Sequence, residues 1–162
     1  MLNKRSVFLV IEVNFTKPKN KPMLQQFLSH APWLQIIVAG VAYFAIGAIW
    51  YAPPVFGKYW SEAHKIVMNE ESKKKMPMLF GGTFIIGIIM ALGMAIALHV
   101  MQSPGTCMNG IKVGLFVSGA FVAPPMGINY MYQGKPFKLW FIDTGYHVVG
   151  LTLMGIILSV WH

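Results

Sequence analysis

The sequence is poor in cysteine and in charged side chains, and each shortage excludes a class of protein. Cys107 is the only cysteine in 162 residues, so neither an intramolecular disulfide nor a metal site built from thiolates can form within one chain. Only 11% of the residues are charged, against roughly 25% in an ordinary soluble domain. Because 56% of the residues are hydrophobic, the composition excludes a water-soluble globule and indicates a membrane protein with several spans.

Acidic residues are especially scarce, with five Asp and Glu against thirteen Lys and Arg and a formal net charge of +8. Such an excess can indicate a nucleic-acid partner, but here the basic residues lie in short segments that flank apolar runs. We therefore expect the lipid bilayer to be the partner of this chain, and no nucleic acid. Methionines such as Met90 and Met94 lie inside apolar runs, where Met is a flexible packing residue, so we expect no bound metal and no cofactor.

Four apolar runs are each long enough to cross about 30 Å of hydrocarbon, which takes roughly 20 helical residues. We therefore predict an all-α, polytopic membrane protein whose four-helix domain covers residues 23–162. Aromatic residues mark the ends of the runs, as they do at membrane interfaces; examples are Trp33, Trp50 and Trp161. The predicted spans cover about 32–51, 78–101, 113–132 and 137–161.

The connections between the spans differ in length. The long first connection, residues 52–77, has an amphipathic pattern that predicts a helix lying at the membrane surface, although a short soluble lid would show the same pattern. Its apolar face comprises Phe56, Tyr59, Trp60, Ala63, Ile66 and Val67, and its charged face carries Lys58, Glu62 and Lys65. Residues 133–136 leave room only for an antiparallel hairpin between the third and fourth spans.

Two prolines interrupt the third span. Pro124 and Pro125 remove two backbone donors and free the carbonyl groups near Ala120 and Phe121. We therefore predict a helix kink at this point.

Small residues recur at helix-packing spacing in the second and third spans, where they allow backbones to approach closely. Because four short spans offer little interior, we expect these faces to pack against another copy of the chain, forming a homo-oligomer. The small residues are Thr83, Gly87, Ala91 and Ala95 in the second span, and Gly110, Gly114 and Ser118 in the third.

The first 22 residues differ from the rest of the chain. Their apolar run, Val7 to Val13, is broken by Glu12 and is followed by no small-residue cleavage site, so we do not expect a signal peptide. We expect a disordered leader, or a mis-assigned start with Met23 as the true first residue.

The leader also decides the predicted orientation. Without it, one lysine lies on the side of the termini and seven lie on the other side; with it, the count of six against seven decides nothing. The positive-inside rule applied to the shorter chain places loop 52–77 and turn 133–136 in the cytoplasm and both termini outside, in the plasma membrane.

Two ionisable residues, Asp143 and His147, lie four positions apart in the fourth span and therefore on one helix face. A carboxylate in hydrocarbon is costly, so we expect Asp143 to lie near the interface, to be protonated, or to pair with His147. An antiparallel hairpin brings residues of the third span to the same depth, and the first span ends on that side. The predicted polar cluster comprises Asp143, His147, Tyr146, Asn129, Tyr130, Trp50 and Tyr51.

Several motifs in these regions resemble one family. They are Trp50-Tyr51-x-Pro53-Pro54 followed by Phe56-Gly57 and Trp60, then Asn129-Tyr130 before Gly134-Lys135-Pro136, and Ile142-Asp143-x-Gly145-Tyr146-His147. From about Met23 to Trp161 the chain resembles the domain-of-unknown-function family numbered 1761. The resemblance implies a four-helix membrane protein and no particular reaction.

Two functions stay open from the sequence. The polar cluster can be a hydrogen-bonded network that holds helices together in a structural or accessory membrane component. Each interhelical polar pair then contributes about 0.6 to 2 kcal/mol to helix association. Alternatively, Asp143 and His147 can serve a proton- or cation-linked transporter or channel subunit, because histidine titrates near neutral pH and an adjacent acid tunes it. We do not expect an enzyme, because the sequence has no zinc-protease motif, nucleophile elbow or phosphate loop.

Overall fold

The structure is a computed structural model that describes residues 22–66 and 69–161. The predicted leader therefore lies outside the described residues, except for Pro22. Helix α2 (Met23–Ser29) belongs to a first unit that ends at Ala31, and the other described elements belong to a second unit that begins at Pro32. Every regular element in these ranges is helical.

The second unit contains four helices that are long and apolar enough to cross a membrane. This confirms the predicted all-α fold with four spans, in which each helix satisfies its own backbone polar groups, as hydrocarbon requires. The four spans are α3 (Trp33–Trp50), α5 (Glu70–Val100), a continuous helical segment over Cys107–Tyr132, and α8 (Phe137–Val160).

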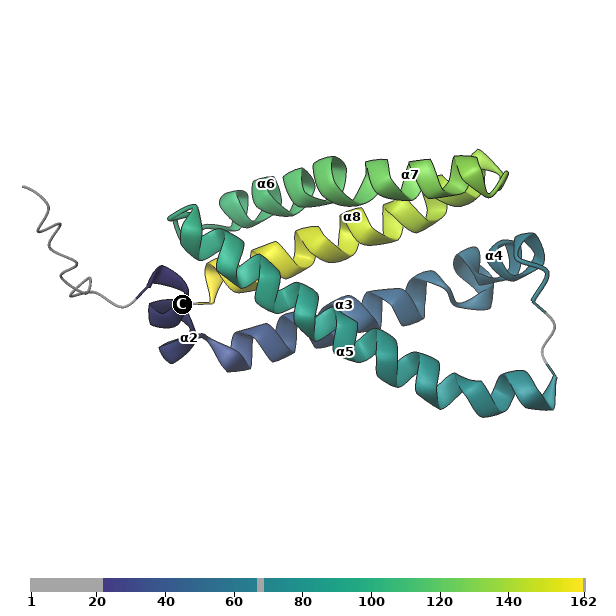
Figure 1. The fold of residues 1–162 in the computed structure, drawn as a ribbon, viewed down its shortest axis with the longest axis horizontal. Helices are drawn as coiled ribbons and strands as arrows, with labels where there is room; N and C mark the ends of the chain where they lie inside the picture. The colour runs from purple at the N-terminus through teal and green to yellow at the C-terminus, as the bar shows by residue number, and fades with distance from the viewer. Residues whose placement is uncertain (1–21, 67–68, 162) are drawn as a thin grey trace, which may run out of the picture. The chain divides into compact units, whose positions relative to one another are not determined.

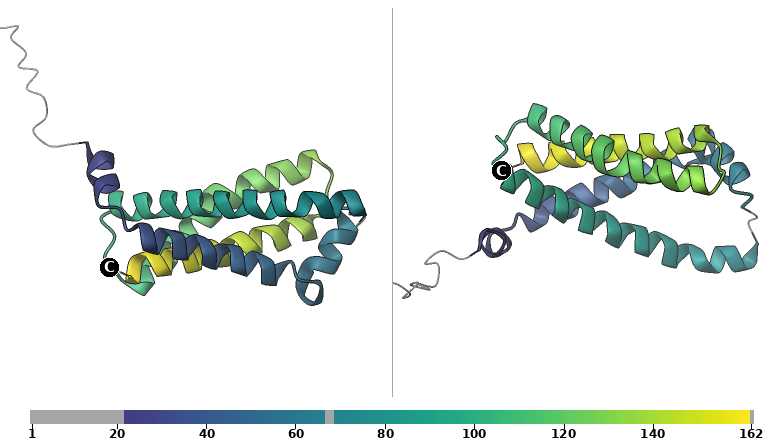
Figure 2. Two further views of the ribbon diagram at one scale, coloured as in Figure 1. Left: turned by 90° about the horizontal axis from the view of Figure 1, so that it is seen from below. Right: turned by 45° about the horizontal axis from the view of Figure 1, so that its top comes forward.

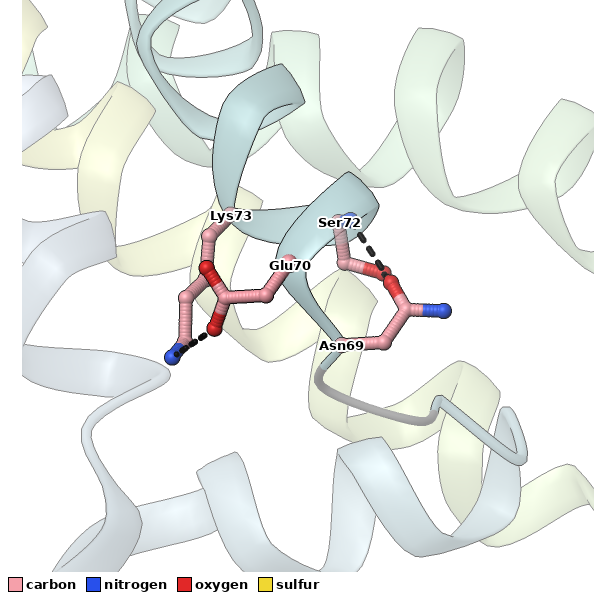
Figure 3. Close-up of polar contacts among 4 residues, drawn as sticks. All are labelled: Asn69, Glu70, Ser72 and Lys73. Carbon is pink, nitrogen blue, oxygen red and sulfur yellow. Dashed lines mark hydrogen bonds and ion pairs between the residues drawn. The ribbon is translucent and has the colours of Figure 1, made fainter.

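Helix α5 begins at Glu70, earlier than the predicted start of the second span near residue 78. Two local interactions explain the early start (Figure 3). The Asn69 side chain accepts a hydrogen bond from the backbone N–H of Ser72 at 2.8 Å, and Lys73 pairs with Glu70 at 2.8 Å. An N-cap and an i,i+3 ion pair both stabilise a first helical turn. The charged run before Pro77 is thus part of the helix.

The third span is built from three pieces: α6 (Cys107–Val117), a π-helical turn η2 (Ser118–Val122) and α7 (Ala123–Tyr132). The span begins before the predicted residue 113 because the Thr106 side chain caps it, accepting from the N–H of Asn109 at 3.3 Å. The π-helical turn ends at Val122, two residues before Pro124. The regular α-helix is therefore interrupted next to the prolines, as expected from their missing N–H groups. A bend of the helix axis there stays a prediction.

The first connection is less helical than predicted. A π-helical turn η1 (Pro53–Gly57) leads into the short helix α4 (Lys58–Ala63). Helical structure stops there, because Lys65 has φ 53°, which an α-helix does not allow. The amphipathic pattern holds within α4, where Lys58 and Glu62 are exposed while Tyr59, Trp60 and Ala63 are partly buried. Val67, predicted on the apolar face, lies outside the described residues.

Helix α8 is the centre of the second unit. It packs against α6 on one side and against α3 on another, and α5 crosses α3 (Figures 1 and 2). The most deeply buried side chains reflect this arrangement, since Leu139 and Met154 of α8 and Ile36 of α3 are fully buried.

The helices bring most lysines of this unit to one end, which we call the basic end. Here α3 and α7 finish and α4, α5 and α8 begin (Figure 1). The basic end carries Lys58, Lys65, Lys73, Lys74, Lys75, Lys135 and Lys138, whereas Lys112 lies on α6 toward the opposite end. The fold therefore places the predicted cytoplasmic lysines together.

The small-residue stripes are used within the chain, and the expectation that they face another copy is wrong. A Cβ at Gly114 would lie 2.5 Å from Cα of Thr152, and a Cβ at Gly110 would collide with the backbone of Gly155. The third-span stripe thus forms the contact between α6 and α8. In α5 the residues Gly87, Ala91 and Ala95 are also buried, so only Thr83 of that stripe is exposed.

Candidate functional site

A buried carboxyl group links three segments of the bundle. Asp143 on α8 is only 7% exposed. The Tyr51 hydroxyl donates to its Oδ1 at 2.7 Å, and the Tyr130 hydroxyl donates to its Oδ2. We call these three residues the tyrosine–aspartate cluster. It ties the end of α3 and the last turn of α7 to the first half of α8.

The short hairpin explains why these residues meet. Tyr130 lies just before the end of α7 and Asp143 lies early in α8, so an antiparallel hairpin sets them at similar depth near the basic end. Next to them, the Trp50 indole N–H donates to the backbone carbonyl of Ile142 at 3.0 Å. Gly145 makes room for this indole, because a Cβ there would lie 3.1 Å from the Trp50 ring.

His147 does not pair with Asp143, contrary to the expectation from their spacing. His147 Nδ1 is hydrogen-bonded to the Tyr43 hydroxyl of α3 at 2.5 Å, and within the described ranges no direct hydrogen bond joins His147 to Asp143. The two side chains share a face of α8 but lie one turn apart along the axis. Each therefore reaches the tyrosine that α3 presents at its own depth.

Tyr146 lies between the two hydrogen-bonded groups. Its ring centroid is 4.9 Å from that of Tyr43 and 5.5 Å from that of Tyr51. Two glycines accommodate the rings: a Cβ at Gly47 would lie 3.1 Å from the Tyr146 hydroxyl, and one at Gly150 would lie 2.6 Å from the Tyr43 ring. A continuous series of phenol and imidazole groups therefore runs from the basic end toward mid-span.

The structure brings together all but one of the predicted cluster residues. Asn129 is exposed on α7 and makes no side-chain hydrogen bond in the described part of the chain. Conversely, Tyr43 is 5% exposed and bonded to His147, although it was not among the predicted cluster residues. Tyr43 could have been recognised from the sequence, because a tyrosine in the middle of an apolar run needs a hydrogen-bond partner for its hydroxyl.

Aromatic side chains from the first connection cover the cluster at the basic end. The Trp60 ring centroid lies 5.3 Å from that of Tyr51, and that of Phe56 lies 4.9 Å from that of Trp50. On its other side Trp60 meets His64, at 4.3 Å between centroids. η1 and α4 thus pack against Trp50 and Tyr51, the two residues at the end of the first span that hydrogen-bond at Asp143 and at the preceding Ile142.

The described residues contain no group of three or more His, Cys, Asp or Glu side chains that could hold a metal ion. The site provides one carboxyl group that accepts hydrogen bonds from two neutral phenols, and one imidazole that is hydrogen-bonded to a third phenol. Such an arrangement can hold helices together, bind a proton or bind a small cation.

Residues 34–159 match the family described as protein of unknown function (DUF1761). The chain belongs to the DUF1761 family. The matched range contains Tyr43, Tyr51, Tyr130, Asp143 and His147, so the site described above lies within the DUF1761 region. Comparison with curated proteins and with solved structures gave no match.

Proposed function

We propose that this protein is a structural or accessory component of the plasma membrane that associates with itself and catalyses no reaction. The observation that carries the proposal is the bonding of Asp143, whose two oxygens are both used by tyrosines from other segments. A carboxyl group engaged in this way holds helices together.

The packing around the cluster supports a locking role. Tyr43, Tyr51 and Tyr146 are in ring contact, and Trp60 covers Tyr51. Interhelical polar contacts in membranes contribute only about 0.6 to 2 kcal/mol each. Several of them joining α3, α7 and α8 select one arrangement of helices that are otherwise mostly apolar.

Self-association is supported by one side of α5 that no other helix in the described ranges covers. A Cβ at Gly82 or Gly93 would meet no atom within 4 Å, and the intervening Ile86 and Ile89 are exposed. These four residues recur at i, i+4, i+7 and i+11, so they form one stripe, which we call the open face of α5. Glycines on it allow close approach of a second backbone.

Replacing Gly82 and Gly93 by Leu tests this part of the proposal. The expected result is a lower oligomeric fraction by mass measurement in nanodiscs, with thermal unfolding unchanged. Gly119→Leu is the matched control, because Gly119 also has no atom within 4 Å of a Cβ but lies on the third span. A monomeric mass of the unmodified protein across mild detergents and nanodiscs would contradict self-association.

A second function is favoured by a different observation. Asp143 makes no ion pair in the described part of the chain, and its hydrogen-bond donors are neutral. A buried carboxyl group without a cation is suited to taking up a proton or a small cation. The rings of Tyr146 and Tyr43 extend from it to His147. We therefore keep a proton- or cation-linked transporter or channel subunit as the alternative.

Flux measurements in proteoliposomes separate the two functions. Transport through Asp143 requires that Asp143→Asn, which keeps the size of the side chain and a hydrogen-bonding group, abolish pH-dependent flux while the protein stays folded. Unchanged flux in the folded variant, or no flux in the unmodified protein under a panel of ion and pH gradients, would remove the alternative.

A further inference from the structure

Lys135 and Lys138 are two of the lysines at the basic end that form no ion pair with an acid in the described part of the chain. In the same ranges, ion pairs join Lys73 to Glu70 and Lys75 to Glu71, all on α5. Lys135 Nζ lies 5.4 Å from the centroid of the Tyr130 ring and Lys138 Nζ lies 4.3 Å from that of Tyr59.

These two lysines lie at the end of two helices that are long and apolar enough to cross a membrane, the place where basic residues meet lipid headgroups. Lys135 lies in the turn between α7 and α8, and Lys138 lies in the first turn of α8. The contact with Tyr59 brings α4 beside them, and α4 adds the exposed Lys58 together with one acid, Glu62. The local charge therefore stays positive.

An exposed apolar surface continues from the lysines into the span. Phe137 is 56% exposed and Phe141 is 61% exposed. Their rings meet edge to face at 5.1 Å between centroids. Lys138 follows Phe137 and precedes Phe141 by three positions, so the charge and the two rings lie on one side of α8.

We propose that Lys135, Lys138, Phe137 and Phe141 form a binding site for one anionic phospholipid. Its phosphate binds between the two ammonium groups, and an acyl chain lies along the two phenylalanine rings. The combination favours a lipid over a soluble anion or an acidic protein, because those partners match the lysines but not the exposed rings inside the span. The site does not depend on self-association or on proton binding by Asp143.

Native mass spectrometry of the full chain tests the proposal, after equilibration with equal amounts of phosphatidylglycerol and phosphatidylcholine. We expect the unmodified protein to retain phosphatidylglycerol over phosphatidylcholine by about fivefold or more, the factor that roughly one lysine contributes at an anionic membrane. K135Q/K138Q is expected to bring the ratio close to one. F137A/F141A is expected to weaken retention of phosphatidylglycerol while both lysines remain.

K73Q/K75Q is the matched control, because it removes the same charge from lysines that are already paired with acids. It should keep the preference, and an equal loss in this control would show that total charge alone attracts the lipid. Thermal unfolding in phosphatidylcholine checks that each variant is folded, and K138Q alone replaces the double variant if the latter unfolds. No preference in the unmodified protein, or displacement of the lipid by soluble glycerol phosphate at equal concentration, would overturn the proposal.

Discussion

The Tyr51 hydroxyl and the Asp143 carboxyl group meet at 2.7 Å although 92 positions separate them in the sequence. Tyr51 follows the last residue of the first span, and Asp143 lies early in the fourth. This hydrogen bond therefore fixes both the depth and the rotation of α3 against α8. The Tyr130 hydroxyl donates to the other carboxyl oxygen and so joins α7 to the same tyrosine–aspartate cluster.

Asp143→Leu should destabilise the protein more than Asp143→Asn. Leucine leaves the hydroxyls of Tyr51 and Tyr130 without their acceptor, which should lower the free energy of unfolding by about 1 kcal/mol or more. Asparagine keeps an acceptor oxygen and should be tolerated. Thermal unfolding in a mild detergent compares the two variants, and equal stability of the Leu and Asn variants would refute the locking role.

Tyr51→Phe should cost about 1 kcal/mol of unfolding free energy, because it removes one hydrogen bond to a carboxyl group while keeping the ring contacts with Trp60 and Tyr146. Tyr59→Phe is the control, since the Tyr59 hydroxyl makes no hydrogen bond among the described residues. The same thermal assay should show a shift for the first variant only. Equal shifts would mean that the Tyr51 hydroxyl adds nothing specific.

Gly114→Ala should destabilise the bundle by about 1 to 3 kcal/mol, the usual cost of overpacking. The added methyl group would meet backbone atoms of Leu151 and Thr152 at 2.5–2.9 Å, and backbone atoms cannot turn aside as a side chain does. Gly93→Ala, in open space on α5, should leave stability unchanged or raise it by up to about 1 kcal/mol, because alanine favours helix. The reverse order in thermal unfolding would contradict the tight α6–α8 contact.

Cys107 provides a test of orientation. It is an exposed, free cysteine at the start of α6, away from the basic end (Figure 1). If the positive-inside rule places the basic end in the cytoplasm, an impermeant maleimide should label Cys107 on intact cells. For comparison, Gln133→Cys in a Cys107→Ser background should react only after the membrane is opened. Labelling of Cys107 exclusively from the cytoplasmic side would reverse the assignment.

Part of the site could be predicted from the local sequence. It could be predicted that Tyr130 and Asp143 lie at similar depth in the bundle, because a four-residue turn leaves an antiparallel hairpin little freedom. The partner of His147 could not be predicted, because an i+4 carboxyl group on the same helix competes with a phenol on another helix. Which of them binds His147 depends on how α3 is rotated against α8, and contacts between the two helices set that rotation.

The sequence by itself determined that this chain forms four membrane-spanning helices, because hydrocarbon requires each apolar run to satisfy its own backbone hydrogen bonds. It also determined where the third span becomes irregular, since Pro124 and Pro125 carry no N–H group. Only the tertiary structure decided that the glycines of α6 pack on α8, that Asn129 stays exposed, and that Tyr43 binds His147. Those choices depend on the rotation and depth of helices relative to one another, and contacts between distant residues set both.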